Sequence, residues 1–241
     1  TDEALGNTSL LRVSDQNSQV NLNNRTQTLT QLDLDVGDAL TGDGALTLNG
    51  SNSVSTIAGA NTGLTADVTL ANGHTLHVDN VASVGNSGTL TVNERTVFEI
   101  KDAAPGSLSK VLSGNGTVNI IDSIFTIAGD NSDFTGAWNL SQGDSTTGTQ
   151  ISVTGGADAV DAALGAGASV GLGKGSTLHL SFADGEGLQS IDEILTGSGV
   201  LSVAGDQNQT FGFESAWDQA SSFDGTLSLS GIGLDVGGGH R

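Results

Sequence analysis

The chain has 241 residues with 36 Gly, one Pro, seven Lys plus Arg and no Cys or Met, a composition unlike that of an average globular enzyme. Its formal net charge of −20 makes nucleic acid and anionic membrane surfaces poor partners, and the absence of Cys excludes disulfides and thiolate metal sites. It has no run of about 18 apolar residues, and its first residues lack the basic and apolar parts of a signal peptide.

Short segments that alternate apolar residues with Thr, Ser or Asn predict β-strands along most of the chain. In chain order they are LTLNG (46–50), VTL (68–70), TLHV (75–78), TLTV (89–92), TVNI (117–120), ISV (151–153), TLHL (177–180), VLSV (200–203) and TLSLS (226–230). Two other segments, GADAVDAALG at 156–165 and GLQSIDEIL at 187–195, predict a loop or a brief helix outside the sheets.

Two phrases recur three times in the same order. The first phrase is LTGDGALTL at 40–48, LSGNGTVNI at 112–120 and LTGSGVLSV at 195–203. The second is LTADVTL at 64–70, FTGAWNL at 134–140 and FDGTLSL at 223–229. The first phrase restarts after 72 and then 83 residues. Because a solenoid turn of three short strands needs about 20 to 25 residues, each repeat is predicted to hold about three turns.

The stacked strands predict an all-β fold, a parallel β-helix (solenoid) that spans 1–241 as one segment. Residues 1–35 are expected to be an atypical N-terminal part, and the internal repeats lie near 40–92, 112–181 and 195–236. The expected core residues are Leu46, Leu48, Val118, Ile120, Leu201, Val203, Phe134, Trp138 and Phe223. A β-sandwich is the alternative, because it also has short strands at this spacing.

The phrases LSGNGTVNI, AGDNSDFTGAWNLSQG and LGAGASVGLGKGSTLHLS resemble the passenger region of AIDA-like autotransporter adhesins of Gram-negative bacteria. The resemblance covers about 40–236 and is closest over 112–181. It implies that the parallel β-helix is right-handed and is displayed at the cell surface after export through the outer membrane. The C-terminal membrane barrel and the signal peptide of such proteins are missing from this sequence, so we expect a passenger segment of a longer protein, joined to the membrane only through that missing barrel.

The resemblance implies adhesion, self-association or biofilm formation rather than catalysis. The expected partners are a second copy of the chain, or a host glycan or matrix protein. Two alternatives stay open: a glycan-active β-helix enzyme, and a stalk that presents another domain.

Asp33, Asp35 and Asp38 are the carboxylates that come closest to a hydrolase pair. Residues two apart on a strand carry side chains about 7 Å apart, a distance that suits glycoside hydrolysis. Arg25 is the only base nearby in the sequence. Because the apolar residues that alternate with these acids explain them as a solvent face, we expect no catalytic pair, with a weak cation site as the alternative.

Ser145 lies in GDST at 143–146, which is similar to the GDSG loop around the nucleophile of trypsin-like proteases. Thr146 replaces the last Gly, and no protease domain with its own His and Asp is evident. We expect an ordinary polar turn.

The four His, His74, His77, His179 and His240, predict no zinc site, since zinc needs three or four convergent ligands and such His usually face solvent. The calcium loops of EF-hands and nonapeptide repeats are missing. We therefore expect neither a metal nor another cofactor.

The two Trp are candidates for stacking on sugars. Trp138 is in register with Val68 and Leu227, so we expect it in the core. Trp217 lies in an irregular acidic segment between strands, and it is the candidate binding residue, on a lateral loop.

Overall fold

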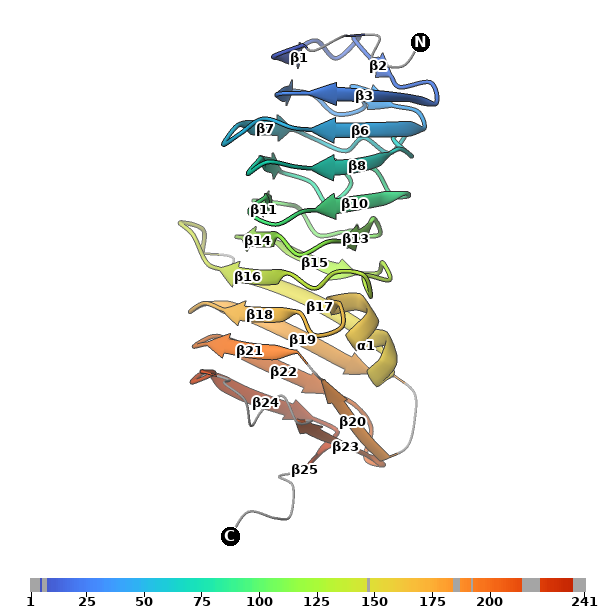
Figure 1. The fold of residues 1–241 in the computed structure, drawn as a ribbon. Coiled ribbons are helices and arrows are strands. Elements are labelled where there is room, and N and C mark those ends of the chain that lie inside the picture. Colours follow the sequence, from blue (N-terminus) through green and yellow to red (C-terminus); the bar gives the residue numbers. More distant parts are fainter. Residues whose placement is uncertain are drawn as a thin grey trace.

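The protein is described here by a computed structural model, which places residues 5, 8–146, 148–183, 187–191, 193–213 and 222–235. Its strands wind into a right-handed parallel β-helix of about ten turns, which forms an elongated rod (Figure 1). All strand pairs between the described residues are parallel. The β-sandwich alternative, which needs antiparallel strands, is therefore wrong.

In chain order, each turn passes over a first, a second and a third face of the rod. The first face is a nine-stranded sheet of β1 (Leu11–Val13), β4 (Leu32–Leu34), β7 (Val54–Ile57), β9 (Thr75–Val78), β11 (Val97–Lys101), β14 (Thr117–Ile121), β16 (Ala137–Ser141), β18 (Ser169–Leu172) and β21 (Ile194–Gly197). From β1 to β16, residues paired across neighbouring strands are 20 to 23 positions apart, which is the length of one turn.

The second and third faces are divided into shorter sheets. The second holds β2 (Val20–Asn21) and β5 (Leu40–Thr41), then β12 (Ser107–Leu108), β15 (Ile124–Ile127), β17 (Thr149–Gly155), β19 (Ser176–Phe182), β22 (Val200–Ala204) and β24 (Thr226–Ser230). The third holds β3 (Arg25–Leu29), β6 (Gly44–Leu48), β8 (Asp67–Leu70), β10 (Thr89–Val92) and β13 (Val111–Ser113), then α1 (Ala157–Leu164), then β20 (Gly187–Ile191), β23 (Gln209–Phe213) and β25 (Gly233–Asp235).

Alternate residues of the strands point into one continuous apolar core. Fully or almost fully buried among the expected core residues are Leu46, Leu48, Val118, Ile120, Leu201, Val203, Phe134 and Trp138. Phe223 packs against this core but stays partly exposed, because it belongs to the last turn that the structure describes.

The two phrases of each repeat lie on consecutive turns and stack directly. Leu46 pairs with Val68, Val118 with Trp138, and Leu201 with Leu227. The repeat therefore encodes a strand together with the strand that covers it in the next turn.

Successive copies of the repeat occupy different faces of the rod. The strand of the first phrase is β6 on the third face, then β14 on the first face and then β22 on the second face. Each repeat contains three full turns and one additional face, in agreement with the expected length of about three turns. Copies of the motif are consequently displaced around the rod, and their equivalent outward side chains do not form one row.

The first Gly of each motif forms the same corner. Gly42, Gly114 and Gly197 have φ of 92°, 93° and 90°, which favour glycine. Each forms an isolated bridge to the residue that opens the second phrase one turn later, Leu64, Phe134 or Phe223. A Cβ atom at Gly114 would lie 2.4 Å from the Val92 carbonyl oxygen, so the backbone of the previous turn also requires glycine here.

Helix α1 (Ala157–Leu164) is the brief helix, one of the two expectations for 156–165, and its C-terminal carbonyl groups accept hydrogen bonds from Asn131 and Trp138. The Asn131 backbone N–H donates to the Ala162 carbonyl (2.6 Å), its side-chain Nδ2 donates to Ala163 (2.6 Å), and the Trp138 indole donates to Leu164 (2.7 Å). These donors satisfy carbonyl groups that a helix end leaves unpaired.

The helix considered for 187–195 is wrong. Residues Gly187–Ile191 form β20, which pairs in parallel with β23 over all five residues. The ladder of the next turn supplies backbone partners that an isolated helical turn would lack.

Candidate functional site

Asp33 and Asp35, two of the three candidate acids, lie beside a base that sequence reasoning missed. Asp33 and Asp35 both contact Arg12 of the preceding turn, at 3.7 and 3.0 Å between side-chain nitrogen and oxygen atoms. Arg25, the base expected nearby, lies on β3 of another face. Parallel stacking brings Arg12 opposite Asp33, and the contacts raise the pKa of Arg12, chiefly through its hydrogen bond to Asp35.

Ser145 lies in a corner turn held by a buried carboxylate. The Asp122 side chain accepts hydrogen bonds from the backbone N–H groups of Gly143 (2.9 Å) and Ser145 (3.1 Å), and the Gln142 side chain donates to the Ser145 carbonyl. These contacts give GDST the role of a polar turn between β16 and β17.

The described His side chains lie apart and have different partners. His74 is fully buried, with Nε2 2.9 Å from the Ser55 hydroxyl, and burial lowers its pKa. The expectation that His74 faces solvent is therefore wrong, because this corner turns inward and the Ser55 hydroxyl provides its partner. His77 contacts Glu99 at 2.7 Å, and His179 contacts Ser202 at 3.0 Å.

Within the described part of the chain, no three His, Asp or Glu side chains gather closely enough to hold a metal ion. His240 and the candidate sugar-binding residue Trp217 lie outside the described residues.

Lys110 is a buried cation whose side chain forms hydrogen bonds to two other turns. Its side chain is fully buried before β13, and Nζ donates to the carbonyl oxygens of Ser87 (2.7 Å), one turn back, and Ala66 (2.6 Å), two turns back. Burial lowers the pKa of Lys110 to about 8, although Asp67 acts in the opposite direction. A neutral amine retains two N–H groups, enough for both carbonyl partners.

The stability of the fold should rise between about pH 8 and 10.5, the folded and ordinary pKa values of Lys110. In this window the folded chain has released the Lys110 proton and the unfolded chain still binds it, so the free energy of unfolding increases with pH, by about 3 kcal/mol in total. The chain has no Cys or Tyr and three Lys, so few other groups titrate here.

Urea unfolding at a series of pH values measures this rise. Lys110→Met should be less stable at every pH, because two carbonyl groups lose their donor, and it should lack the rise. The same slope in both proteins would show that Lys110 is not its source.

A continuous row of polar side chains marks the outer side of the first face. From β1 to β16, consecutive turns place these residues in register: Arg12, Asp33, Thr56, His77, Glu99, Asn119 and Asn139. The row is linked by the Arg12–Asp33 and His77–Glu99 contacts and by a 3.2 Å hydrogen bond from the Asn139 amide to Asn119. We call it the polar ladder.

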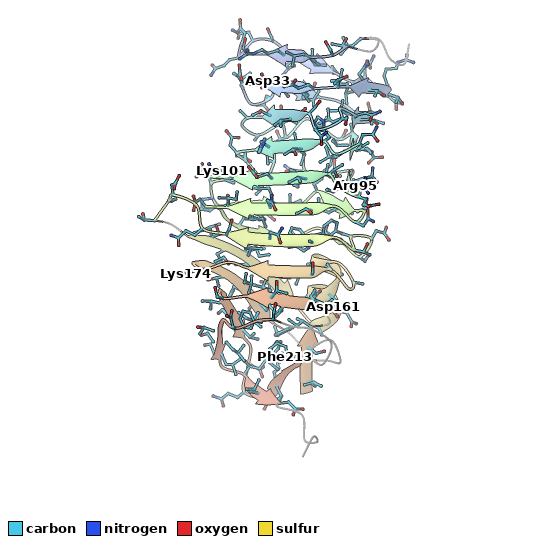
Figure 2. The ribbon with its side chains drawn as sticks, turned by 60° about the vertical axis from the view of Figure 1, so that its left-hand side comes forward. Asp33, Arg95, Lys101, Asp161, Lys174 and Phe213 are labelled. Atoms are coloured by element: carbon cyan, nitrogen blue, oxygen red, sulfur yellow. The ribbon has the colours of Figure 1, made fainter. Side chains whose placement is uncertain are left out.

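The polar ladder lies beside several of the seven bases of this acidic chain. Arg12 belongs to the ladder, and Lys101 ends β11. Figure 2 shows Lys101 and Lys174 along one edge of the rod and Arg95 along the other. The first face thus carries positive as well as negative groups.

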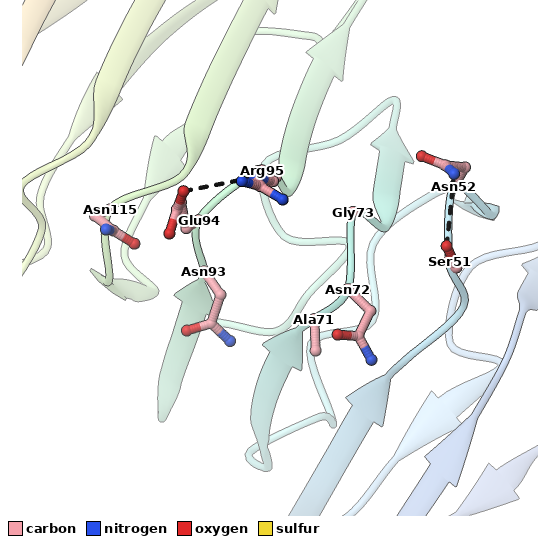
Figure 3. A pocket seen from close by; sticks show the side chains of 9 residues that line it. All are labelled: Ser51, Asn52, Ala71, Asn72, Gly73, Asn93, Glu94, Arg95 and Asn115. Atoms are coloured by element: carbon pink, nitrogen blue, oxygen red, sulfur yellow. Dashed lines mark hydrogen bonds and ion pairs between the residues drawn. The ribbon is translucent and has the colours of Figure 1, made fainter.

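A shallow groove of about 880 Å³ runs along the corner between the third and first faces. Its lining, shown in Figure 3, consists of Ser51, Asn52, Ala71, Asn72, Gly73, Asn93, Glu94, Arg95 and Asn115. The side chains of Glu94 and Arg95 contact each other at 3.5 Å. Four of the nine lining residues are Asn, and we call this surface the corner groove.

None of the helices placed by the structure is both long enough and apolar enough to cross a bilayer. Comparison of the chain with protein-family models, with curated proteins and with solved structures gives no match.

Proposed function

We propose that this protein is a surface-displayed adhesive rod, exported through the outer membrane of a Gram-negative bacterium as the passenger segment of an autotransporter, and that it self-associates through extended polar contacts. The polar ladder is the observation that supports this most directly. It repeats at the strand spacing of about 4.8 Å, so two rods aligned along their axes can match many rungs at once.

The ladder carries groups of both signs and both hydrogen-bonding senses. Arg12 and Asp33 mark one end, His77 and Glu99 the middle, and neutral Asn139 the other end. A second copy can therefore supply an acceptor for each donor. The contact would be isologous, with the same face used twice around a two-fold axis and the rods antiparallel.

Salt should promote this association. At about 0.01 M salt the screening length is about 30 Å and two rods of charge −20 repel each other, whereas at about 0.15 M it is about 8 Å. Short hydrogen bonds survive this change, so weak dimers should appear as salt rises. Analytical ultracentrifugation across this range measures the effect.

Two isosteric variants, one on the polar ladder and one on another face as its control, extend that experiment. Asn139→Asp adds a charge to the polar ladder, whereas Gln150→Glu adds the same charge to the second face, on β17. Asn139→Asp should weaken the dimer more than Gln150→Glu. A chain that stays strictly monomeric at high concentration in 0.15 M salt would disprove self-association.

A further inference from the structure

Two rows of neutral polar side chains follow the third face to its edge at the corner groove. The first row consists of hydroxyl residues in register on β3, β6, β8, β10 and β13: Thr28, Thr47, Thr69, Thr91 and Ser113. The second row lies two residues further along the four later strands: Asn49, Ala71, Asn93 and Asn115. Three of these four rungs thus combine a hydroxyl with an amide.

These side chains are held in place by the coil. The Thr91 and Ser113 hydroxyls lie 3.0 Å apart, and the Asn93 amide donates to the Leu70 carbonyl of the preceding turn at 2.8 Å. The Asn72 amide donates to the Asn49 side chain. The rows are at least partly exposed, so their remaining donors and acceptors face solvent.

The shape of the corner groove suits an extended polar ligand. The groove extends over the turns that contain Asn52, Asn72, Asn93 and Asn115, at about 4.8 Å per turn. That rise is close to the length of one pyranose ring. Pockets for small molecules are mostly apolar, whereas seven of the nine residues that line this groove are polar and four of them are Asn.

The charge of the groove selects the class of ligand. Its one carboxylate, Glu94, faces its one guanidinium, Arg95, so the surface is neutral within a chain of charge −20. An acidic polymer would be repelled by the rod as a whole. Sugar hydroxyls, in contrast, both donate to and accept from amide and hydroxyl side chains.

We propose that the two rows and the corner groove bind a linear neutral polysaccharide that lies along the rod axis, about one sugar per turn. The inference rests on the adhesive function proposed above, to which it adds a partner class and a site on another face from the polar ladder.

The test is an NMR titration of the labelled chain with cellohexaose, mannohexaose and xylohexaose, and with hexagalacturonate as the acidic control. At least one neutral hexasaccharide should shift the amide signals of Thr91, Asn93 and Asn115, and hexagalacturonate should not. The double variant Thr91→Val/Asn115→Ala should raise the Kd about tenfold or more, through two lost hydrogen bonds.

A matched double variant on the second face, Thr126→Val/Gln150→Ala, should leave the Kd unchanged. Absence of shifts with all three neutral sugars at millimolar concentration, equal losses in the two variants, or equal binding of hexagalacturonate would each overturn the inference. Salt-dependent dimers that persist without sugar binding would leave self-association standing alone. Sugar binding by a strictly monomeric chain would support the polysaccharide site and disprove self-association.

Discussion

Replacement of Ile120 by Asp should lower the free energy of unfolding by about 4 kcal/mol or more. Ile120 is fully buried in β14, between Ile100 of the preceding turn and Leu140 of the next. The variant loses apolar contacts on both sides. It also places a carboxylate between two aliphatic side chains, which cannot donate a hydrogen bond to it. Urea denaturation followed by circular dichroism measures the loss.

The adjacent residue provides the control. Asn119 is on the outer side of the same strand, where its Oδ1 accepts the Asn139 amide hydrogen bond and its neighbour in the preceding turn is Glu99. Asn119→Asp keeps the acceptor and adds one like-charge contact, so it should cost less than about 1 kcal/mol. Equal losses in the two variants would mean that the strand faces are reversed.

The second large effect is expected at Asn131, a fully buried residue that joins three turns. Its Oδ1 accepts from the Leu112 N–H of the preceding turn at 2.7 Å, and its Nδ2 donates to Ala163 at the end of α1. Asn131→Ala leaves a buried N–H and a buried carbonyl unpaired, which should cost about 3 to 5 kcal/mol. Thermal or urea unfolding measures the loss.

The exposed neighbour Ser132 allows a matched substitution on the same turn. Its backbone N–H bonds to Asp130, and this contact survives Ser132→Ala. That variant should unfold within about 0.5 kcal/mol of the wild type. A loss at Asn131 no larger than the loss at Ser132 would contradict the bridging role of Asn131.

Local sequence was sufficient to predict many of the strands and their assembly into a stacked coil. Alternation identifies which side chains of a segment such as 117–120 point inward, and the aligned phrases place Trp138 in register with Val68, which correctly predicts that Trp138 lies in the core. Both features depend on a few adjacent residues and on one repeat length.

Other features depend on residues that only the winding of the coil brings together. The face on which each motif lies follows from the sum of all preceding turn lengths, so β6, β14 and β22 could not be assigned to faces from their own residues. The roles of Asn131 and Lys110 depend on carbonyl groups of other turns. Lys110 gave one weak signal, a lone cation directly before an apolar strand.

The candidate surfaces were predictable in character but not in position. The sequence indicated polar outer faces, yet the neighbours of Asp33 and His77 are Arg12 and Glu99, each about one turn away. The corner groove could not be foreseen, because its side chains come from four successive turns. Side-chain chemistry is local, whereas its arrangement depends on the register of the whole coil.

Inter-strand NMR contacts test most directly the claim that the motifs stack as parallel turns and so build continuous polar rows. In a deuterated, amide-protonated sample, the Asn119 backbone amide should show contacts to residues around Glu99 on one side and around Asn139 on the other, in parallel register. If 117–121 instead paired in antiparallel register with the next strand along the chain, that result would contradict the coil and both of its proposed binding surfaces.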